Sequence, residues 1–228
     1  TAPSRHRPSP RCWKAPAGPI PDGMNPEPIG ILAAIPVKPF GVAKARLSTQ
    51  LSPEQRARLG KAIAARTAIL SRQAGADVVI VTGDDGVAEW ATALGFVVLP
   101  EGPVASLEGA ARTVAETAAA GGRRWVVVHA DLPLATAGDL RIAFAAATEG
   151  ALVVPSHDGG TNLLAGSDPA FPFAYGTGSF HRHLAASPRA AVIAHPRLAM
   201  DLDTPADLAF ARHAKGGSWL TPFLQPHL

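Results

Sequence analysis

The stretch Asp77-Val78-Val79-Ile80-Val81-Thr82 decides the fold of this chain. Its run of β-branched residues is typical of a strand that is buried on both faces of a sheet. The residues before it predict a helix, because Ser52-Pro53-Glu54-Gln55 combines an N-cap residue, a proline at the first helical position and an early acid, and Gly75 ends the pattern. An earlier apolar run, Ile31 to Val37, predicts a first strand. Strand, helix and strand in this order form the βαβ unit of a parallel sheet.

The same alternation continues along the chain and predicts a single α/β domain over residues 29–214, with a mostly parallel sheet flanked by helices. The expected later strands are 96–99, 125–129, 151–155 and 191–195, and the expected later helices are 85–94, 105–120, 137–147, 179–186 and 204–213. Residues 156–178 break this rhythm with glycines, prolines and the short apolar segment Asn162-Leu163-Leu164-Ala165. We expect an inserted hairpin with binding loops there.

The two ends of the chain have compositions that do not favour a packed core. Residues 1–28 contain eight prolines together with several basic residues, which predicts a disordered leader. Met24 stands just before the first strand, so residues 1–23 are either an over-extended gene start or a genuine flexible arm. From Gly216 the chain is again rich in small residues, and we expect residues 215–228 to form a flexible tail.

Composition narrows the classes of partner. Of the 228 residues, 47% are apolar and 17% charged, which is typical of a globular protein, and the formal net charge is only +3. This charge favours a small polyanionic ligand over a nucleic acid. The single cysteine, Cys12, excludes an internal disulfide. No apolar run approaches the roughly 20 residues that span a membrane, and no signal-peptide core is present. We therefore expect a cytoplasmic protein without a membrane partner.

Three aspartates stand where the expected sheet gathers its ligands. Asp131 follows the apolar run Trp125 to Val128, so it should emerge at the carboxyl end of a central strand. Asp201 and Asp203 are separated by one residue, so in an extended segment both carboxylates point to the same side. Clustered carboxylates repel one another unless a cation compensates them, and a divalent cation with oxygen ligands suits this set.

Both motifs also have a purely structural interpretation. Asp131 could cap the turn before Pro133, and Asp203 directly precedes Thr204-Pro205-Ala206-Asp207, which resembles the start of a helix. From the sequence alone, one of the acids could serve only as a cap.

A basic loop lies between the first expected strand and the first long helix. Lys38, Lys44 and Arg46 stand within nine residues of otherwise apolar chain, where they can surround a triphosphate, although a solvated loop would have the same composition. The sequence has no G-x-x-x-x-G-K-[ST] motif and no G-x-G-x-x-G after the first strand. Kinases or GTPases of the P-loop type and dinucleotide-dependent dehydrogenases are therefore excluded.

Two glycine-rich loops suggest a second anion site. Gly159-Gly160-Thr161-Asn162 and Tyr175-Gly176-Thr177-Gly178-Ser179 expose backbone N–H and hydroxyl donors, and the second loop directly precedes an expected helix. The glycines could equally serve only to make tight turns. His181 and His183 on that helix are two residues apart, a spacing that does not face one metal ion, so we expect solvated histidines.

With these segments in place, residues 29–214 resemble the CofC/FbiD family, the guanylyltransferases of coenzyme F420 biosynthesis. The matching pieces are Pro36-Val37-Lys38, Ala43-Lys44-Ala45-Arg46-Leu47, Asp131-Leu132-Pro133, Gly160-Thr161-Asn162, Tyr175-Gly176-Thr177-Gly178-Ser179 and Asp201-Leu202-Asp203-Thr204-Pro205-Ala206-Asp207-Leu208. Each piece is short, but their order and spacing are fairly specific. One departure is Ser106-Leu107-Glu108, where family members often have Leu-Asn.

The resemblance implies a GT-A-like, Rossmann-like nucleotidyltransferase fold and a reaction that joins GMP from GTP to a three-carbon phosphoacid, with release of diphosphate. It implies Mg²⁺, as two ions, on Asp131, Asp201 and Asp203. It also implies that Thr161, Gly176 and Ser179 hold the phosphoacid. Phosphoenolpyruvate is the favoured acceptor, with 2-phospho-L-lactate and 3-phospho-D-glycerate as alternatives, and the next enzyme of the pathway is a candidate partner.

Two rival functions remain on the same fold. Molybdenum-cofactor guanylyltransferases and sugar-nucleotide transferases usually carry a glycine-rich loop after the first strand, whereas this chain has Ala34-Ile35-Pro36-Val37-Lys38. A catalytically silent nucleotide-binding protein is the other alternative, and the presence of all three acids with the basic loop argues against it.

Overall fold

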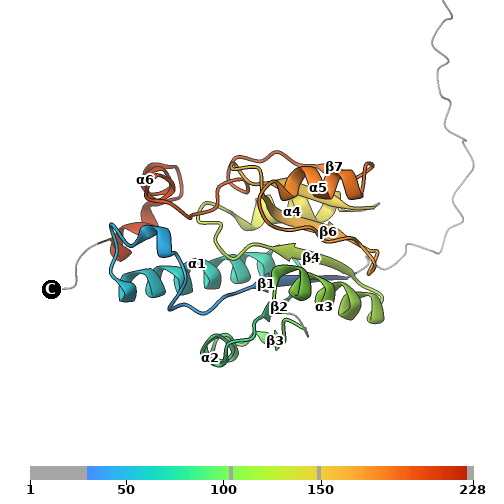
Figure 1. Cartoon of the computed structure of the whole chain (residues 1–228), viewed down its shortest axis with the longest axis horizontal. Coiled ribbons are helices and arrows are strands. Elements are labelled where there is room, and N and C mark those ends of the chain that lie inside the picture. Colours follow the sequence, from blue (N-terminus) through green and yellow to red (C-terminus); the bar gives the residue numbers. More distant parts are fainter. Residues whose placement is uncertain (1–29, 103–104, 148–149, 225–228) are drawn as a thin grey trace, which may run out of the picture.

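The fold is seen in a computed structural model, which describes residues 30–102, 105–147 and 150–224 (Figure 1). The expected leader, residues 1–28, lies outside the described residues. Seven strands form one sheet in the order β3-β2-β1-β4-β6-β5-β7. The expected single sheet with helices on both faces is thus present.

The βαβ unit that the sequence predicts is confirmed. Strand β1 spans Ile31–Pro36, helix α1 spans Pro53–Gln73 and strand β2 spans Asp77–Val81, and the two strands are parallel neighbours. Strand β3 (Val97–Leu99) pairs parallel with β2, and β4 (Arg124–Val128) pairs parallel with β1. Their carboxyl ends therefore lie at one edge of the sheet.

The expected inserted hairpin is instead part of the sheet. Strand β5 spans Leu152–Pro155 and strand β6 spans Thr161–Gly166, and the two are antiparallel. However, β6 also pairs with β4, so it lies inside the sheet, and all six of its residues are buried. The reason is that its apolar residues have a neighbouring strand on each side and a helical layer on each face.

Two layers of helices cover the sheet. Helices α1, α2 (Asp85–Ala93) and α4 (Ala137–Ala146) contribute side chains to the core on one face. Helices α3 (Leu107–Ala120) and α5 (Ser179–Ala186) contribute to the core on the other face. A third cluster joins α1 to α6 (Pro205–His213) and to two short 3₁₀ helices, η1 (Ala45–Leu47) and η2 (Ser218–Phe223). No described helix has both the length and the hydropathy to cross a membrane.

The C-terminal part differs from expectation at two places. Strand β7 is only Ala191–Val192, shorter than the expected 191–195, and it pairs with β5 at the edge of the sheet. The expected flexible tail contains η2, whose Leu220 is fully buried in the third cluster. A leucine at this position can bury its side chain against α1 and α6, which local composition does not reveal.

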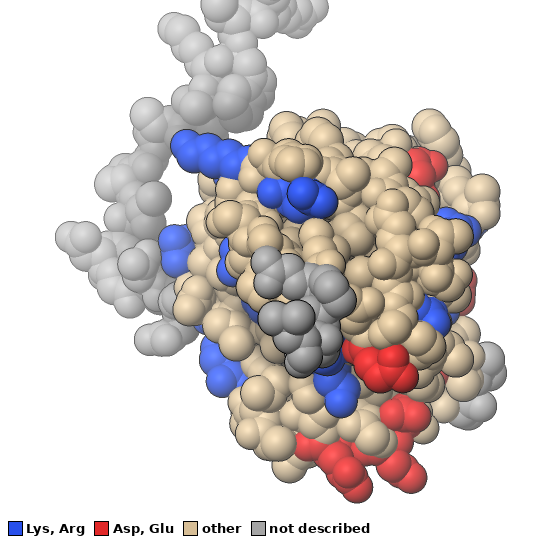
Figure 2. Space-filling model, turned by 90° about the vertical axis from the view of Figure 1, so that its left-hand side faces the viewer, with Lys and Arg blue, Asp and Glu red and all other residues tan. Residues whose placement is uncertain are grey.

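Charges are dispersed on the face shown in Figure 2. Basic side chains are scattered over this face with uncharged residues between them, and most of the acidic ones gather toward its lower edge. The described residues that are visible on this face thus form no continuous basic stripe of the kind that binds nucleic acid.

Candidate active site

Asp131 and the Asp201–Asp203 segment lie next to each other at the carboxyl end of the sheet. Asp131 follows β4 by three residues, and its carbonyl oxygen accepts a hydrogen bond from the Leu202 N–H at 3.0 Å. This backbone contact fixes the segment before α6 against the end of β4. The two acidic motifs that the sequence singles out are therefore brought together by the fold.

Lys44 connects two of the three acids. Its Nζ donates to Asp131 Oδ2 at 2.6 Å and to Asp203 Oδ1 at 3.1 Å, and only 9% of its side chain is exposed. Lys44 has φ 56°, the only positive φ of a non-glycine residue in the described chain. This left-handed conformation, just before η1, is sparsely populated because of steric conflict at Cβ, and such strain concentrates at functional sites.

The charges of this cluster shift one another's protonation. Burial alone would lower the pKa of Lys44, but the carboxylates of Asp131 and Asp203 outweigh it and raise this pKa. Burial would raise the pKa of Asp131, but the charge of Lys44 outweighs it and lowers this pKa. Burial and the nearby charge of Asp131 raise the pKa of Asp201. The protonation of Lys44, Asp131 and Asp201 therefore depends on the charges of their neighbours in this site.

Neither Asp131 nor Asp203 serves as the cap of a helix. Helix α4 is capped by Thr136, and α6 is capped by Thr204. In α6 it is Asp207 that completes the capping box, since its Oδ2 accepts from the backbone N–H of both Asp203 and Thr204. The side chain of Asp203 is consequently left free to reach Lys44.

Asp201 faces a different set of polar groups. Its Oδ1 lies 3.2 Å from His157 Nδ1 and accepts from Asn162 Nδ2 at 3.3 Å. His157 Nε2 lies 3.3 Å from Asp207 Oδ1, so this imidazole bridges two carboxylates. The sequence gives no signal for His157, because its partners lie 42 and more residues away.

The carboxylates offer oxygen ligands of the type that Mg²⁺ prefers. Asp131 Oδ1 is buried and has no hydrogen-bond partner among the described residues, which is the state expected of an atom whose partner is an ion or ligand. Among the described residues, however, no three His, Cys, Asp or Glu side chains are arranged to hold a metal ion as they stand. The donors fit a magnesium ion chemically, but the Lys44 ammonium already neutralises two of them.

The basic loop is brought to the acids only in part. Arg46 Nη1 lies 3.9 Å from Asp203 Oδ2, with most of its side chain exposed. Lys38 is exposed and forms no ion pair with a described residue. The two cations nearest the acids, Lys44 and Arg46, thus line the same place, whereas Lys38 lies free on the loop.

Thr161, Gly176 and Ser179 form a second group of neighbouring residues, which we call the hydroxyl cluster. Ser179 Oγ donates to Thr161 Oγ1 at 3.1 Å, and the Ser179 N–H donates to the Gly176 carbonyl at 3.0 Å. Gly176 has φ +99°, a conformation that favours glycine. The three residues that resemblance assigns to the phosphoacid therefore lie together.

A register shift in β6 places Thr161 in this cluster. Val154 lies opposite Leu163, but the next residue, Pro155, lies opposite Thr161. The extra residue on β6 is Asn162, and such bulges re-aim side chains next to active sites. As a result Thr161 faces Ser179 of α5, while Asn162 faces Asp201. Consecutive residues at the start of β6 therefore touch both clusters.

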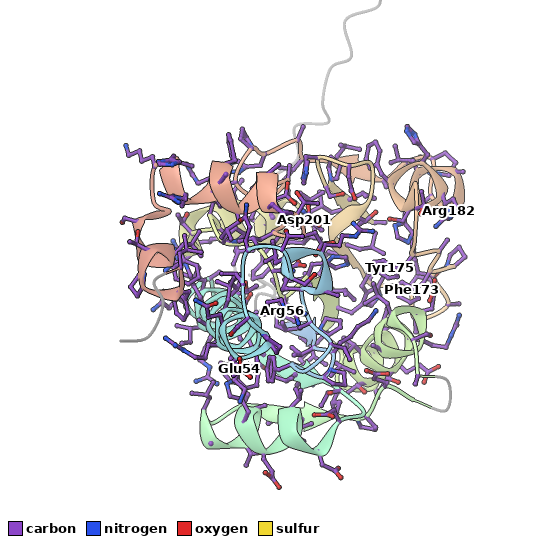
Figure 3. All side chains as sticks on the ribbon, turned by 60° about the vertical axis from the view of Figure 1, so that its left-hand side comes forward. Glu54, Arg56, Phe173, Tyr175, Arg182 and Asp201 are labelled. Atoms are coloured by element: carbon purple, nitrogen blue, oxygen red, sulfur yellow. The ribbon has the colours of Figure 1, made fainter. Side chains whose placement is uncertain are left out.

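His183 is buried, so the expectation that it is solvated is wrong. Its side chain is fully inaccessible, while His181 is exposed. Its neighbour Arg182 donates to the carbonyl oxygens of Ala174, Tyr175 and Thr177 at 3.1, 2.6 and 2.5 Å. Figure 3 shows Arg182 and Tyr175 on the α5 side of the molecule and Asp201 toward α6. Helix α5 thus fixes the loop that carries Gly176.

Glu108, in the first turn of α3, lies near the same cluster. Burial is the main cause that raises the pKa of Tyr175, and the charge of Glu108 raises it further. Burial also lowers the pKa of His183, and the charge of Glu108 opposes this lowering. The hydroxyl of Tyr175 is buried, and no residue in the described part of the chain forms a hydrogen bond with it. Glu108, which departs from the family pattern, therefore lies beside the hydroxyl cluster.

The chain is similar to known proteins in sequence and in structure. The chain is 36% identical over 185 residues to a phosphoenolpyruvate guanylyltransferase of Salinispora arenicola, covering 78% of this chain and 85% of the relative. It is 36% identical over 206 residues to an enzyme of the same name from Rubrobacter xylanophilus, covering 85% and 98%. A nucleotidyl transferase from Methanothermobacter has a similar structure, with a TM-score of 0.55 at 19% identity, covering 82% and 97%.

The expected GT-A-like fold is confirmed, because the chain shares its fold with this nucleotidyl transferase and with a putative nucleotide-diphospho-sugar transferase from Desulfovibrio desulfuricans, with a TM-score of 0.66 at 16% identity, covering 85% of this chain and 96% of that one. Residues 31–216 match the family described as guanylyl transferase, CofC like. This match covers most of the chain and includes both clusters. The chain therefore belongs to the CofC-like guanylyl transferase family.

Proposed function

We propose that this protein transfers the guanylyl group of GTP to phosphoenolpyruvate, releases diphosphate, depends on Mg²⁺ and acts in the biosynthesis of coenzyme F420. The observation that carries the proposal is the start of β6. There Thr161 belongs to the hydroxyl cluster, and Asn162 contacts Asp201. We call Asp131, Asp201 and Asp203, together with Lys44, the acidic cluster. A phosphoacid held by the hydroxyl cluster would thus lie beside the acidic cluster.

The reaction needs charge neutralisation rather than a protein nucleophile. The acceptor phosphate has a second pKa of about 6, so at neutral pH it is already largely a dianion. One of its oxygens forms a bond to the α-phosphorus of GTP, and the bond from that phosphorus to the β-bridging oxygen breaks, so that diphosphate leaves with the electron pair. Two anions must approach each other for this step, and the obstacle is their repulsion.

The residues of this chain have separate tasks in that step. Lys44 and Arg46, with Lys38 from the same loop, offset the charge of the triphosphate and of the departing diphosphate. Thr161, Ser179 and the backbone at Gly176 orient the acceptor. Asp131, Asp201 and Asp203 would hold Mg²⁺, which would supply further positive charge to the reaction. Because Lys44 contacts Asp131 and Asp203, it must exchange one or both of these partners for phosphate oxygens when metal and GTP are bound.

The acceptor is tested by product analysis. The purified full chain is incubated with GTP, MgCl₂ and, separately, phosphoenolpyruvate, 2-phospho-L-lactate or 3-phospho-D-glycerate, with the next enzyme of the pathway present to consume an unstable product. Mass spectrometry should find the guanylylated product with phosphoenolpyruvate, and diphosphate should form in equal amount. Product with another of the three acids only would correct the acceptor, and no product with any of them would refute guanylyl transfer.

The acidic cluster is tested by one substitution. Asp203→Ala should reduce turnover by about 10²-fold or more, because a charged group at the reacting phosphates is lost. The fold should persist, since the α6 cap depends on Thr204 and Asp207. Asp85→Ala is the matched control, because it removes an exposed carboxylate from α2, outside the site. Near-normal turnover of the Asp203 variant with an intact circular dichroism spectrum would contradict the assignment.

We also propose the cytoplasm as the compartment of this reaction. The support is the single cysteine of the sequence, together with the enzyme's need for GTP.

A further inference from the structure

The imidazole of His183 joins two segments of the hydroxyl cluster. Its Nδ1 lies 3.0 Å from Thr161 Oγ1, and its Nε2 accepts a hydrogen bond from the Ala174 N–H at 3.1 Å. The ring of Tyr175 packs edge-on against it, with centroids 4.9 Å apart. Both ring nitrogens of a fully buried histidine are therefore engaged.

The contact with Ala174 decides which nitrogen carries the hydrogen. A backbone N–H can only donate, so Nε2 must present its lone pair. A neutral ring then carries its hydrogen on Nδ1. Burial, aided by the charge of Arg182, lowers the pKa of His183 to about 4, which keeps the ring neutral near pH 7. Nδ1 consequently donates to Thr161 Oγ1.

The hydroxyl groups of Thr161 and Ser179 then have one hydrogen to spare. They bring two hydrogens, and one of these forms the hydrogen bond between them at 3.1 Å. His183 cannot accept the other, because it is itself a donor at this contact. Both residues are only 2% exposed, and a buried donor without an acceptor is unfavourable. The remaining hydrogen is suited to an anionic ligand.

We propose that His183 is a positioning residue, whose Nδ1–H forces the Thr161–Ser179 pair to direct its spare hydrogen at an anionic oxygen of the acceptor. The inference rests on the proposed function, because it takes this pair as a contact of the phosphoacid. His183 itself touches no substrate in this scheme. If a hydrogen-bond-accepting atom stood in place of Nδ1–H, the hydroxyl hydrogen of Thr161 would turn toward residue 183. The phosphoacid would then lose a hydrogen-bond donor.

Two substitutions separate this role from packing. In His183→Asn the amide nitrogen replaces Nδ1 and can still donate to Thr161, but no group remains for Ala174. In His183→Gln the amide oxygen replaces Nε2 and can still accept from Ala174, but no donor reaches Thr161. His181→Gln is the matched control, because it alters the exposed histidine of the same helix. For each protein the KM of phosphoenolpyruvate, the KM of GTP, kcat and Tm are measured.

We expect His183→Gln to raise the KM of phosphoenolpyruvate roughly 10-fold or more, since without the Nδ1–H donor the Thr161 hydroxyl is no longer held in the orientation that donates to the charged phosphoacid. The KM of GTP should change little, and His183→Asn should raise the acceptor KM clearly less than His183→Gln does. If the two variants raise both KM values alike, or follow only the loss of Tm, His183 has a packing role and the proposal is overturned. A wild-type enzyme inactive with all three phosphoacids would instead refute the proposed function.

A measurement on the unaltered protein tests the same point without a variant. In the ¹⁵N–¹H spectrum of ¹⁵N-histidine-labelled protein at pH 7, His183 should show the neutral form with its hydrogen on Nδ1. The signal is assigned by its absence from His183→Gln or His183→Asn. An Nε2–H form, or a doubly protonated ring, would overturn the proposal whatever the kinetics of the variants.

Discussion

At the scale of single residues, Lys44 decides the state of the acidic cluster. It adopts an unfavourable backbone conformation and places its ammonium between Asp131 and Asp203. Without a cation at this place, the carboxylates would repel one another. If Mg²⁺ binds to these carboxylates, as we propose, the lysine and the metal would compete for the same oxygens, and the ammonium would become available for phosphate.

This competition predicts the behaviour of Lys44→Gln. The variant should bind Mg²⁺ more tightly than the wild type, and saturating MgCl₂ should raise its Tm by roughly 2–4 °C more, which corresponds to about 1 kcal/mol of additional stabilisation. Its turnover should fall, because the triphosphate loses a cation. The measurement is thermal unfolding across a series of MgCl₂ concentrations.

Lys38→Gln is the control for that experiment, since it removes a lysine of the same loop that has no ion pair with a described residue. Its Mg²⁺-dependent shift in Tm should equal that of the wild type. The competition is refuted if Lys44→Gln also behaves like the wild type.

At the scale of elements, β6 organises the site because it is held in the middle of the sheet. Its last residue, Gly166, lies opposite Trp125 of β4. Trp125 is fully buried, and its Nε1 donates to the Asp168 carbonyl at 3.0 Å. A Cβ at position 166 would lie only 2.6 Å from the indole ring. The indole can pack here only because residue 166 has no side chain.

Gly166→Ala should therefore destabilise the protein. The added methyl group must displace the Trp125 ring, and overpacking of this kind costs about 1–3 kcal/mol. Urea unfolding monitored by tryptophan fluorescence measures the loss.

Gly138→Ala serves as the comparison. Gly138 is an exposed residue of α4 whose new Cβ would meet nothing closer than 3.7 Å. This variant should match or exceed the stability of the wild type, because alanine is the better helix former. Equal stability of the two variants would show that the packing at Trp125 is not tight.

At the scale of the whole molecule, a partly buried ion pair connects the middle of the chain to its C-terminal part. Asp139 in the first turn of α4 accepts from Arg197 Nε at 2.7 Å and from a second guanidinium nitrogen, and His195 Nε2 lies 3.4 Å from the same carboxylate. Burial would raise the pKa of Asp139, but hydrogen bonds from Arg197 and from Thr136 outweigh it and lower this pKa below 3.8. The segment that leads to Asp201 is thereby anchored to α4.

This anchor predicts a pH dependence of stability. The folded-state pKa of Asp139 lies below its unfolded-state value, so its contribution is complete above about pH 5 and is lost as the pH falls toward the folded-state pKa. Asp139→Asn should lower the free energy of unfolding at pH 7 by about 1–3 kcal/mol. In urea unfolding between pH 7 and pH 3, the two proteins should converge at the acidic end. A difference in stability that stays constant with pH would contradict the ionised pair.

The sequence by itself determined the order of strands and helices, the parallel part of the sheet and the positions of the three aspartates. These features depend on local signals, namely apolar runs, caps and acids that follow a strand, which neighbouring residues provide. Only the tertiary structure decided that Lys44 joins Asp131 and Asp203, because those partners are 87 and 159 residues apart. It likewise decided that β6 lies within the sheet with a register shift, and that His183 is buried against Thr161. A side chain's surroundings at such places are set by segments that meet only in the folded chain, so local sequence carries no record of them.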